Sequence, residues 1–200
     1  GAGMSEGNGL PPQQGRTLVI GLAALFFVPL LAAFYLYYAG GWRPAGRTNH
    51  GELVTPARPL PTASFAQPDG QPATAANFRG KWTLVYLGDG RCAEDCQRAL
   101  WVMRQTRVLL AQDMDRVQRV FVAEQNCCNL TFLQTEHPGL ALLTPLDAAA
   151  WLAEFPRTDT AHSLYVVDPL GNLMMRFDAR QNPKGLLTDL QKLLKLSHIG

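Results

Sequence analysis

The feature that most constrains this chain is a pair of cysteines between an apolar run and a helical pattern. Cys92 and Cys96 follow the apolar residues 82–87 and precede a segment with apolar side chains at near-helical spacing: Leu100, Trp101, Met103, Val108 and Leu109. A buried strand that leads into a helix through two thiols is typical of redox sites, because the helix N-terminus lowers the pKa of a thiol. Three residues separate the cysteines instead of two, which also leaves room for a metal ion between the sulfurs. Since two thiolates leave a metal under-coordinated, a third ligand is expected elsewhere in the chain.

The composition excludes one class of function and leaves the compartment open. The chain of 200 residues has 18 Lys and Arg against 16 Asp and Glu. A net charge of +2, spread along the sequence, is too small for a nucleic-acid-binding surface. The 4 cysteines form stable disulfides only in an oxidising compartment, so the location of the chain decides their chemistry.

An uncharged segment near the N-terminus predicts a transmembrane helix. Residues 17–38 carry no charged side chain, and about 22 residues at about 1.5 Å each span roughly 33 Å, enough to cross a bilayer core. A cleaved signal peptide is the alternative, but its apolar core is shorter and ends at small residues. We therefore predict a short tail at 1–16 and a retained anchor at 17–38. The end of this span carries rings expected of an aromatic belt: Tyr35, Tyr37, Tyr38 and Trp42.

Two observations on the orientation of this anchor oppose each other. Arg16 is the only basic residue before the span, whereas Arg43 and Arg47 follow it, and this count slightly favours a cytoplasmic domain. A short tail followed by a large folded domain favours the opposite orientation. We predict that the domain lies outside the cytoplasm.

The rest of the chain predicts a tether and one α/β domain. Residues 39–62 are rich in Gly, Pro and Arg without periodicity, as in a linker, and the domain is expected at 63–200. The order strand, helix, strand, helix, strand, strand, helix predicts a thioredoxin-like fold with a leading β-hairpin. The predicted elements are a hairpin at 64–74, strands at 82–87, 117–123, 163–167 and 173–177, and helices at 95–112, 146–155 and from Pro183, with a further short strand at 140–143 outside this order.

A candidate third ligand stands just before the predicted strand at 163–167. In a thioredoxin-like fold the start of that strand lies beside the cysteine loop, so His162 is expected to face Cys92 and Cys96. Two thiolates and one imidazole form a soft, three-coordinate set that suits copper, with zinc as the alternative metal. The alternative for His162 is a surface or capping histidine without a metal.

Together these features resemble the Sco/SenC family of cytochrome oxidase assembly factors. The resemblance covers roughly residues 64–196. It implies a membrane-anchored, thioredoxin-fold domain in which Cys92, Cys96 and His162 bind copper. The matching motifs are Phe78-Arg79-Gly80-Lys81-Trp82, Cys92-Ala93-Glu94-Asp95-Cys96 and His162-Ser163 with Asp168-Pro169-Leu170-Gly171.

The chain also departs from the usual pattern of this family. Typical members carry proline after each cysteine, where this chain has Ala93 and Gln97, and Glu94 replaces the usual aspartate. The segment that follows Cys96 is also shorter than usual. These differences favour an alternative function, a thiol–disulfide oxidoreductase that uses Cys92 and Cys96 catalytically without metal. A peroxiredoxin-like relative is disfavoured because the Thr-x-x-Cys signature is absent.

The resemblance implies a membrane-tethered copper chaperone and thiol–disulfide factor for the copper centre of cytochrome c oxidase. Its implied metal is copper. The implied partners are a respiratory oxidase subunit that carries a copper site and other copper chaperones. The implied location is the bacterial inner membrane, with the domain facing the periplasm. Whether the chain is an enzyme depends on redox chemistry at Cys92 and Cys96.

Two further cysteines, Cys127 and Cys128, have no counterpart in the family pattern. They follow the predicted strand at 117–123 and should lie at the same sheet edge as the first pair. We interpret them as small, largely buried thiols that are not bonded to each other, because a ring of adjacent cysteines is strained. The alternative is an auxiliary thiol that relays electrons or copper. His137 is interpreted as a loop residue.

Overall fold

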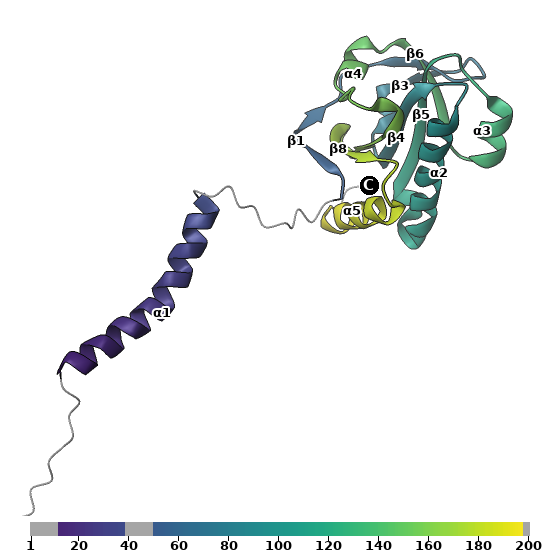
Figure 1. Cartoon of the computed structure of the whole chain (residues 1–200). Coiled ribbons are helices and arrows are strands. Elements are labelled where there is room, and N and C mark those ends of the chain that lie inside the picture. Colours follow the sequence, from purple (N-terminus) through teal and green to yellow (C-terminus); the bar gives the residue numbers. More distant parts are fainter. Residues whose placement is uncertain (1–11, 39–49, 198–200) are drawn as a thin grey trace, which may run out of the picture. The chain divides into compact units, whose positions relative to one another are not determined.

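The chain divides into two units, residues 1–47 and 48–200, which are described separately. The structure is a computed structural model that describes residues 12–38 and 50–197 (Figure 1). The predicted tail up to residue 11 and the first part of the predicted tether, residues 39–49 with Trp42, Arg43 and Arg47, lie outside the described residues, as does the side chain of Tyr37.

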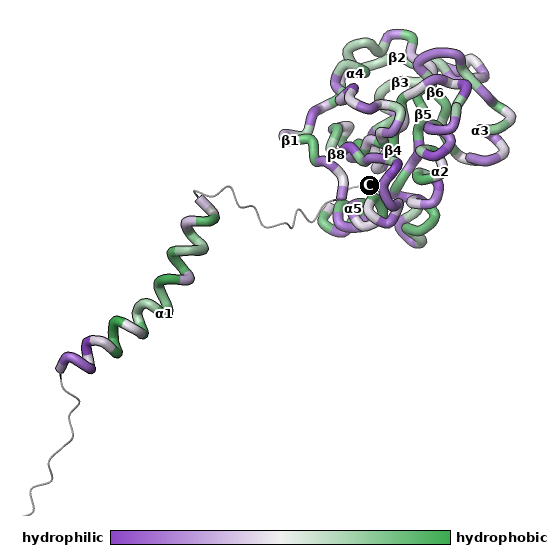
Figure 2. The backbone as a smooth tube through the Cα atoms, viewed as in Figure 1, coloured by the Kyte–Doolittle hydropathy of each residue, from purple (hydrophilic) through white to green (hydrophobic). Residues whose placement is uncertain are grey.

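The described part of the first unit is one helix, α1 (Pro12–Tyr38). Its residues are apolar over most of its length (Figure 2), and their side chains are exposed. Among the described residues it is the one helix long and apolar enough to cross a membrane, over Pro12–Leu36 with a mean hydropathy of 2.5. A helix that is apolar on every side needs apolar surroundings, which lipid supplies. The apolar helix predicted at 17–38 is confirmed and begins earlier, at Pro12, because proline suits the first turn of a helix.

The second unit is built on one mixed, eight-stranded sheet in the order β1-β8-β7-β4-β5-β6-β2-β3 (Figure 1). β4, β5 and β6 are parallel to one another, and the other neighbouring strands are antiparallel. The predicted leading hairpin is confirmed, with β2 and β3 paired at one edge of the sheet. The strands are β1 (Glu52–Pro59), β2 (Ser64–Ala66), β3 (Pro72–Thr74), β4 (Trp82–Asp89), β5 (Val117–Gln125), β6 (Ala141–Asp147), β7 (Ser163–Val167) and β8 (Asn172–Asp178).

Two apolar clusters cover the two faces of this sheet, because successive side chains of a strand point to opposite faces. In the central strand β4, Leu84 and Tyr86 join the cluster under α2 (Glu94–Leu109) and α5 (Pro183–Leu196). Val85 and Leu87 join the other cluster, which includes Trp151 of α4 (Ala149–Ala153). The end of β4 and the start of α2 therefore meet above a fully packed sheet.

The structure corrects the prediction of a tether as far as residue 62, because residues 52–59 form the edge strand β1, antiparallel to β8. Only Val54 of this strand is even partly buried, so no apolar alternation marks it in the sequence. Backbone pairing with β8 and hydrogen bonds just before the strand hold β1 in place instead. The N–H groups of His50 and Gly51, just before β1, donate to the buried carboxylate of Asp189 in α5, at 2.9 and 2.6 Å.

Two helices also differ from the prediction. The helix expected at 146–155 is only α4, because residues up to Asp147 continue β6, where Asp147 lies opposite Ser64 of β2. The sequence pattern does not predict α3 (Leu130–Glu136). Its single buried residue, Leu133, leaves no apolar stripe to reveal the helix.

Candidate dithiol and metal site

Cys92 and Cys96 lie at the junction of β4 and α2 and are joined by a disulfide, with their Cα atoms 5.0 Å apart. Cys96 belongs to the first turn of α2, and Cys92 precedes it in the left-handed backbone region with φ of 51°. Both residues are buried, with exposed fractions of 1% and 5%. The predicted strand, cysteine loop and helix are therefore all present, and the sulfurs are bonded and enclosed by the core.

Asp89 at the end of β4 organises this loop. Its carboxylate accepts hydrogen bonds from the backbone N–H of Arg91 at 2.8 Å and from the Arg91 guanidinium at 3.0 and 3.1 Å. It also accepts from the side-chain amides of Asn126 at 2.9 Å and Gln125 at 3.2 Å. The bonds from Arg91, then that from Asn126, hold the pKa of the Asp89 carboxyl well below its usual range. The ionised carboxylate ties the cysteine loop to the loop after β5.

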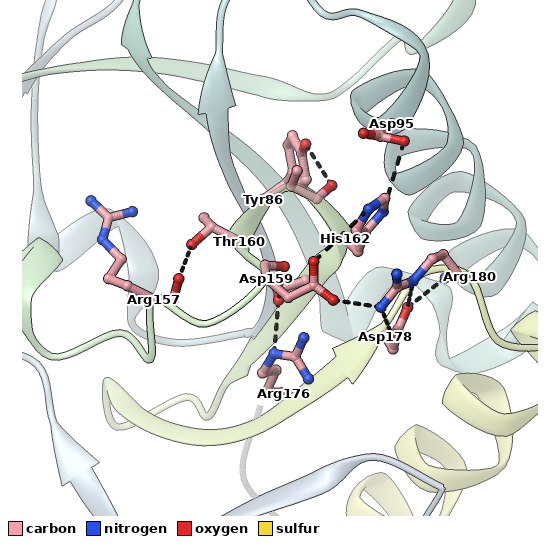
Figure 3. A network of polar contacts seen from close by, with 11 residues as sticks. Tyr86, Asp95, Arg157, Asp159, Thr160, His162, Arg176, Asp178 and Arg180 are labelled. Carbon is pink, nitrogen blue, oxygen red and sulfur yellow. Dashed lines mark hydrogen bonds and ion pairs between the residues drawn. The ribbon is translucent and has the colours of Figure 1, made fainter.

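His162 ends a short turn, η3 (Thr160–His162), directly before β7 (Figure 3). Its Nδ1 lies 3.8 Å from Oδ1 of Asp95 in the first turn of α2, and its Nε2 lies 3.9 Å from Oδ1 of Asp159. Because Asp95 is the neighbour of Cys96, the structure brings His162 to the helix terminus that carries the disulfide. Both distances exceed hydrogen-bond range, so neither carboxylate locks the imidazole in this orientation.

Strands β4 and β7 hold the backbone on either side of His162. The Tyr86 hydroxyl in β4 donates to the carbonyl of Ala161 at 2.9 Å (Figure 3). Burial raises the pKa of Tyr86 to about 12, and the charge of Asp95 acts in the same direction. The hydroxyl of the buried Ser163 donates to the carbonyl of Asp159 at 2.7 Å. The turn that presents His162 is thus anchored at both ends.

The carboxylate that faces Nε2 of His162 is itself fixed by a cation. Arg180 pairs with Asp159 at 2.5 Å and with Asp178 at 2.7 Å (Figure 3). Hydrogen bonding by Arg180 lowers the pKa of Asp178 to about 2. The guanidinium therefore holds Asp159 in place beside the imidazole.

The predicted metal ligands are not assembled as a metal site in this disulfide form. Within residues 12–38 and 50–197, no group of three or more His, Cys, Asp or Glu side chains is gathered to hold a metal ion. The reason is chemical, since two sulfurs bonded to each other supply no thiolate. The donor types nevertheless fit a soft metal, because reduction would free two thiolates at a helix N-terminus that an imidazole also approaches.

Comparison with known proteins decides the family. Residues 82–197, which run from the start of β4 to the end of α5, match the family model of the transmembrane-like, thioredoxin-like C-terminal domain. The chain belongs to this family. The match contains the cysteine loop, the turn of His162 and the α-helices α2, α3, α4 and α5.

The resemblance to the Sco/SenC family is also confirmed. The mitochondrial protein SCO2 homologue of Mus musculus is 32% identical over 153 residues, which cover 72% of this chain but only 57% of that protein. Among solved structures, copper-bound ScoI from Bradyrhizobium japonicum aligns with a TM-score of 0.54 and 19% identity, over 67% of this chain and 98% of that one. Apo Sco1 from Thermus thermophilus aligns with a TM-score of 0.60 and 20% identity, over 74% and 99%. At such identities the two structures confirm the thioredoxin-like fold alone.

The structure overturns the interpretation of Cys127 and Cys128 as buried, unbonded thiols. The two residues are joined by a disulfide. Cys127 is exposed, and Cys128 is partly buried against the same apolar cluster that contains Cys92 and Cys96. The loop after β5 turns outward at Asn126, which has a φ of 52°, and this turn carries Cys127 to the surface.

His137 lies in the loop between α3 and β6, as predicted, but it is buried there. It follows α3, is only 4% exposed and packs edge-on against the ring of Phe132, with centroids 5.6 Å apart. Burial lowers its pKa to about 4, and the charges of Arg104 and Arg119 act in the same direction. The sequence pattern did not reveal this burial, and the neighbouring charges of Arg104 and Arg119 come from α2 and β5, which are distant in the sequence.

Proposed function

We propose that this chain is a membrane-anchored copper carrier that holds its cargo with Cys92, Cys96 and His162. The observation that carries the proposal is the meeting of these residues at one helix terminus, where His162 lies 3.8 Å from the residue next to Cys96. Two thiolates and an imidazole suit copper better than they suit a hard cation. The copper bound to ScoI of Bradyrhizobium japonicum, which shares the fold, supports the same cargo here.

Loading is expected to depend on the redox state of the cysteine pair. Reduction of the Cys92–Cys96 disulfide takes two electrons and releases both sulfurs at the N-terminus of α2, which stabilises thiolates. His162 is held through the backbone of its turn, while its ring is free of hydrogen bonds to Asp95 and Asp159. We therefore expect the ring to turn toward the thiolates when metal binds.

The resemblance to the Sco/SenC family extends the proposal to partners and location. We propose an arrangement of tail (1–16), anchor (17–38), tether (from 39) and thioredoxin-like domain, with the domain on the periplasmic face of a bacterial inner membrane. Two disulfides in the domain support an oxidising compartment. The proposed partners are the oxidase subunit that receives copper and other copper chaperones that supply it.

Copper binding by the full chain in detergent tests this function. The protein is fully reduced without oxygen, loaded with excess Cu(I) and desalted. We expect close to one copper per chain by metal analysis. Cys92→Ser or Cys96→Ser should abolish retention, and His162→Ala should weaken the affinity at least about tenfold in competition with a Cu(I) chelator, because it removes one donor.

His50→Ala is the matched control, since it removes an imidazole that lies against Gly185 of α5 instead of the cysteine loop. This variant should bind copper as the wild type does. Loss of all copper from the reduced wild type on desalting would show that the three-ligand site is wrong. Equal affinity of the His162→Ala variant would remove His162 from the ligand set.

The formed Cys92–Cys96 disulfide favours a second candidate function, thiol–disulfide exchange without metal. Its burial argues against rapid catalysis, because the attacking thiolate must reach a sulfur along the bond axis. The two functions differ in how copper affects turnover.

A further inference from the structure

The two loops that carry the cysteine pairs lie against each other although 31 positions of sequence, from 96 to 127, separate the pairs. Gly90 in the first cysteine loop donates its N–H to the carbonyl of Gln125 at 2.7 Å, and its own carbonyl accepts from the N–H of Asn129 at 2.9 Å. A Cβ on Gly90 would come within 2.6 Å of the Cα of Cys127 and of the carbonyl oxygen of Asn126. Only glycine allows this approach, so the backbones of the two cysteine loops are in direct contact.

The contact sets an upper limit on the distance between the two disulfides. Gly90 is about 4 Å from Cys127 and at most about 7 Å from Cys92 between Cα atoms, so Cys92 and Cys127 are at most about 11 Å apart. A disulfide between two residues needs a Cα separation of about 4.4–6.8 Å. Cys128 already packs against the cluster that contains Cys92 and Cys96, which directs one member of the outer pair inward.

The two cysteine pairs differ in their exposure to solvent. Cys92 and Cys96 are 1% and 5% exposed, whereas Cys127 is exposed to solvent. Thiol–disulfide exchange requires an incoming thiolate to contact a sulfur directly. A protein dithiol can therefore approach Cys127 but not the buried Cys92–Cys96 bond.

We propose that Cys127 and Cys128 form a second redox centre through which an external protein dithiol reduces the Cys92–Cys96 disulfide. In the first exchange, a thiolate of the external dithiol attacks Cys127 and Cys128 leaves as a thiolate. The second external thiol then resolves the mixed disulfide. The external dithiol becomes a disulfide, and the Cys127/Cys128 pair gains two electrons and, as neutral thiols, two protons.

In the second exchange, the thiolate of Cys128 attacks one sulfur of the Cys92–Cys96 bond, and the other sulfur leaves as a thiolate. Cys127 then attacks Cys128, which re-forms the outer disulfide and releases the second inner thiol. Two electrons and two protons have moved inward, and the outer pair is ready for another cycle. This inference concerns how electrons reach the inner pair and stands whether or not that pair carries copper.

Reduction kinetics of the oxidised full chain in detergent test the relay. Reduced thioredoxin is the external dithiol, samples are quenched with acid and an alkylating agent, and peptide mass mapping reports each pair separately. In the Cys127→Ser/Cys128→Ser double variant, we expect reduction of Cys92–Cys96 to slow at least about tenfold, because only direct attack on buried sulfur remains. Thr131→Ala, an exposed change in the adjoining α3, is the matched control and should keep the wild-type rate.

The reciprocal variant, Cys92→Ser/Cys96→Ser, gives a second test that does not depend on the folding of the first. Thioredoxin should reduce its Cys127–Cys128 pair at the wild-type initial rate, because the outer pair receives electrons first. Circular dichroism confirms that each variant is folded. The relay is overturned if the first double variant is reduced at the inner pair within about twofold of the wild-type rate, or if the outer pair of the second resists thioredoxin.

Discussion

At the scale of single residues, the candidate ligand His162 depends on side chains that carry no chemistry themselves. Tyr86 holds the carbonyl just before it, and Ser163 holds the start of the same turn. Arg176 of β8 in turn donates from Nε to the Ser163 hydroxyl at 2.7 Å. The imidazole is thus presented by a rigid turn while its own nitrogens stay unbonded to the neighbouring carboxylates. We therefore expect the ring to rotate when metal binds, while the backbone of the turn stays in place.

His137 supplies a prediction on pH at the same scale. Its pKa in the folded chain is about 4, below the usual value of 6.5, mainly because of burial. On acidification the unfolded chain therefore takes up the proton first, and stability falls as the pH drops from about 6.5 to about 4. The loss is at most about 3 kcal/mol in the free energy of unfolding.

Denaturant unfolding of the detergent-solubilised chain at several pH values measures how the free energy of unfolding depends on pH. The His137→Leu variant removes the titrating group but keeps an apolar side chain in the site. Its stability should change less with pH over the same interval, whatever its absolute value. Parallel pH profiles for the two proteins would contradict the buried, neutral histidine.

At the scale of elements, the N-terminus of α2 exerts opposing effects on the inner cysteine pair. The helix end favours thiolates, whereas Glu94 and Asp95 in its first turn stabilise the helix and oppose further negative charge. The three intervening residues and the burial of both sulfurs also restrict exchange with large substrates. These features agree with the proposed copper carrier better than with rapid redox turnover.

Insulin reduction by the full chain, with and without stoichiometric Cu(I), separates the carrier from the reductase. We expect slow turnover that copper suppresses further, because coordinated thiolates are not free to attack a disulfide. Reduced thioredoxin run under the same conditions is the reference for rapid turnover. Thioredoxin-like rates that are unaffected by copper would favour the metal-free oxidoreductase.

At the scale of the whole molecule, the chain combines an apolar helix with a domain that contains two disulfides. Apolar side chains exposed around α1 are stable in lipid, and disulfides persist in an oxidising compartment. These two properties agree with a domain held at a membrane surface outside the cytoplasm. The positive-inside count, with Arg43 and Arg47 after the span, remains the opposing observation.

Fractionation and protease protection test this placement. Carbonate washing should leave the protein in the membrane fraction, because a spanning apolar helix is not released by high pH. Protease should reach the domain only from the outer face of the inner membrane. Recovery of the protein in the wash would exclude a spanning anchor, and cleavage only from the cytoplasmic side would reverse the orientation.

Several features could be predicted from the sequence because their causes are local. Apolar spacing marks α1, α2 and α5, apolar runs mark β4 and β7, and the turn at 68–70 marks the hairpin of β2 and β3. The motif of Cys92 and Cys96 predicted a dithiol at the start of a helix. Hydrogen bonding within a helix and side-chain alternation along a strand act over a few residues, so a short stretch of chain records them.

Only the tertiary structure decided the features that depend on distant partners. β1 is exposed on most of its length and exists because β8 offers it a paired edge. His137 is buried near Arg104 of α2 and Arg119 of β5, and Cys127 reaches the surface beside Gly90 because parallel strands β4 and β5 end together. The physical reason is that burial and strand pairing are set by contacts between segments far apart in the chain, which leave no periodic mark in either segment alone.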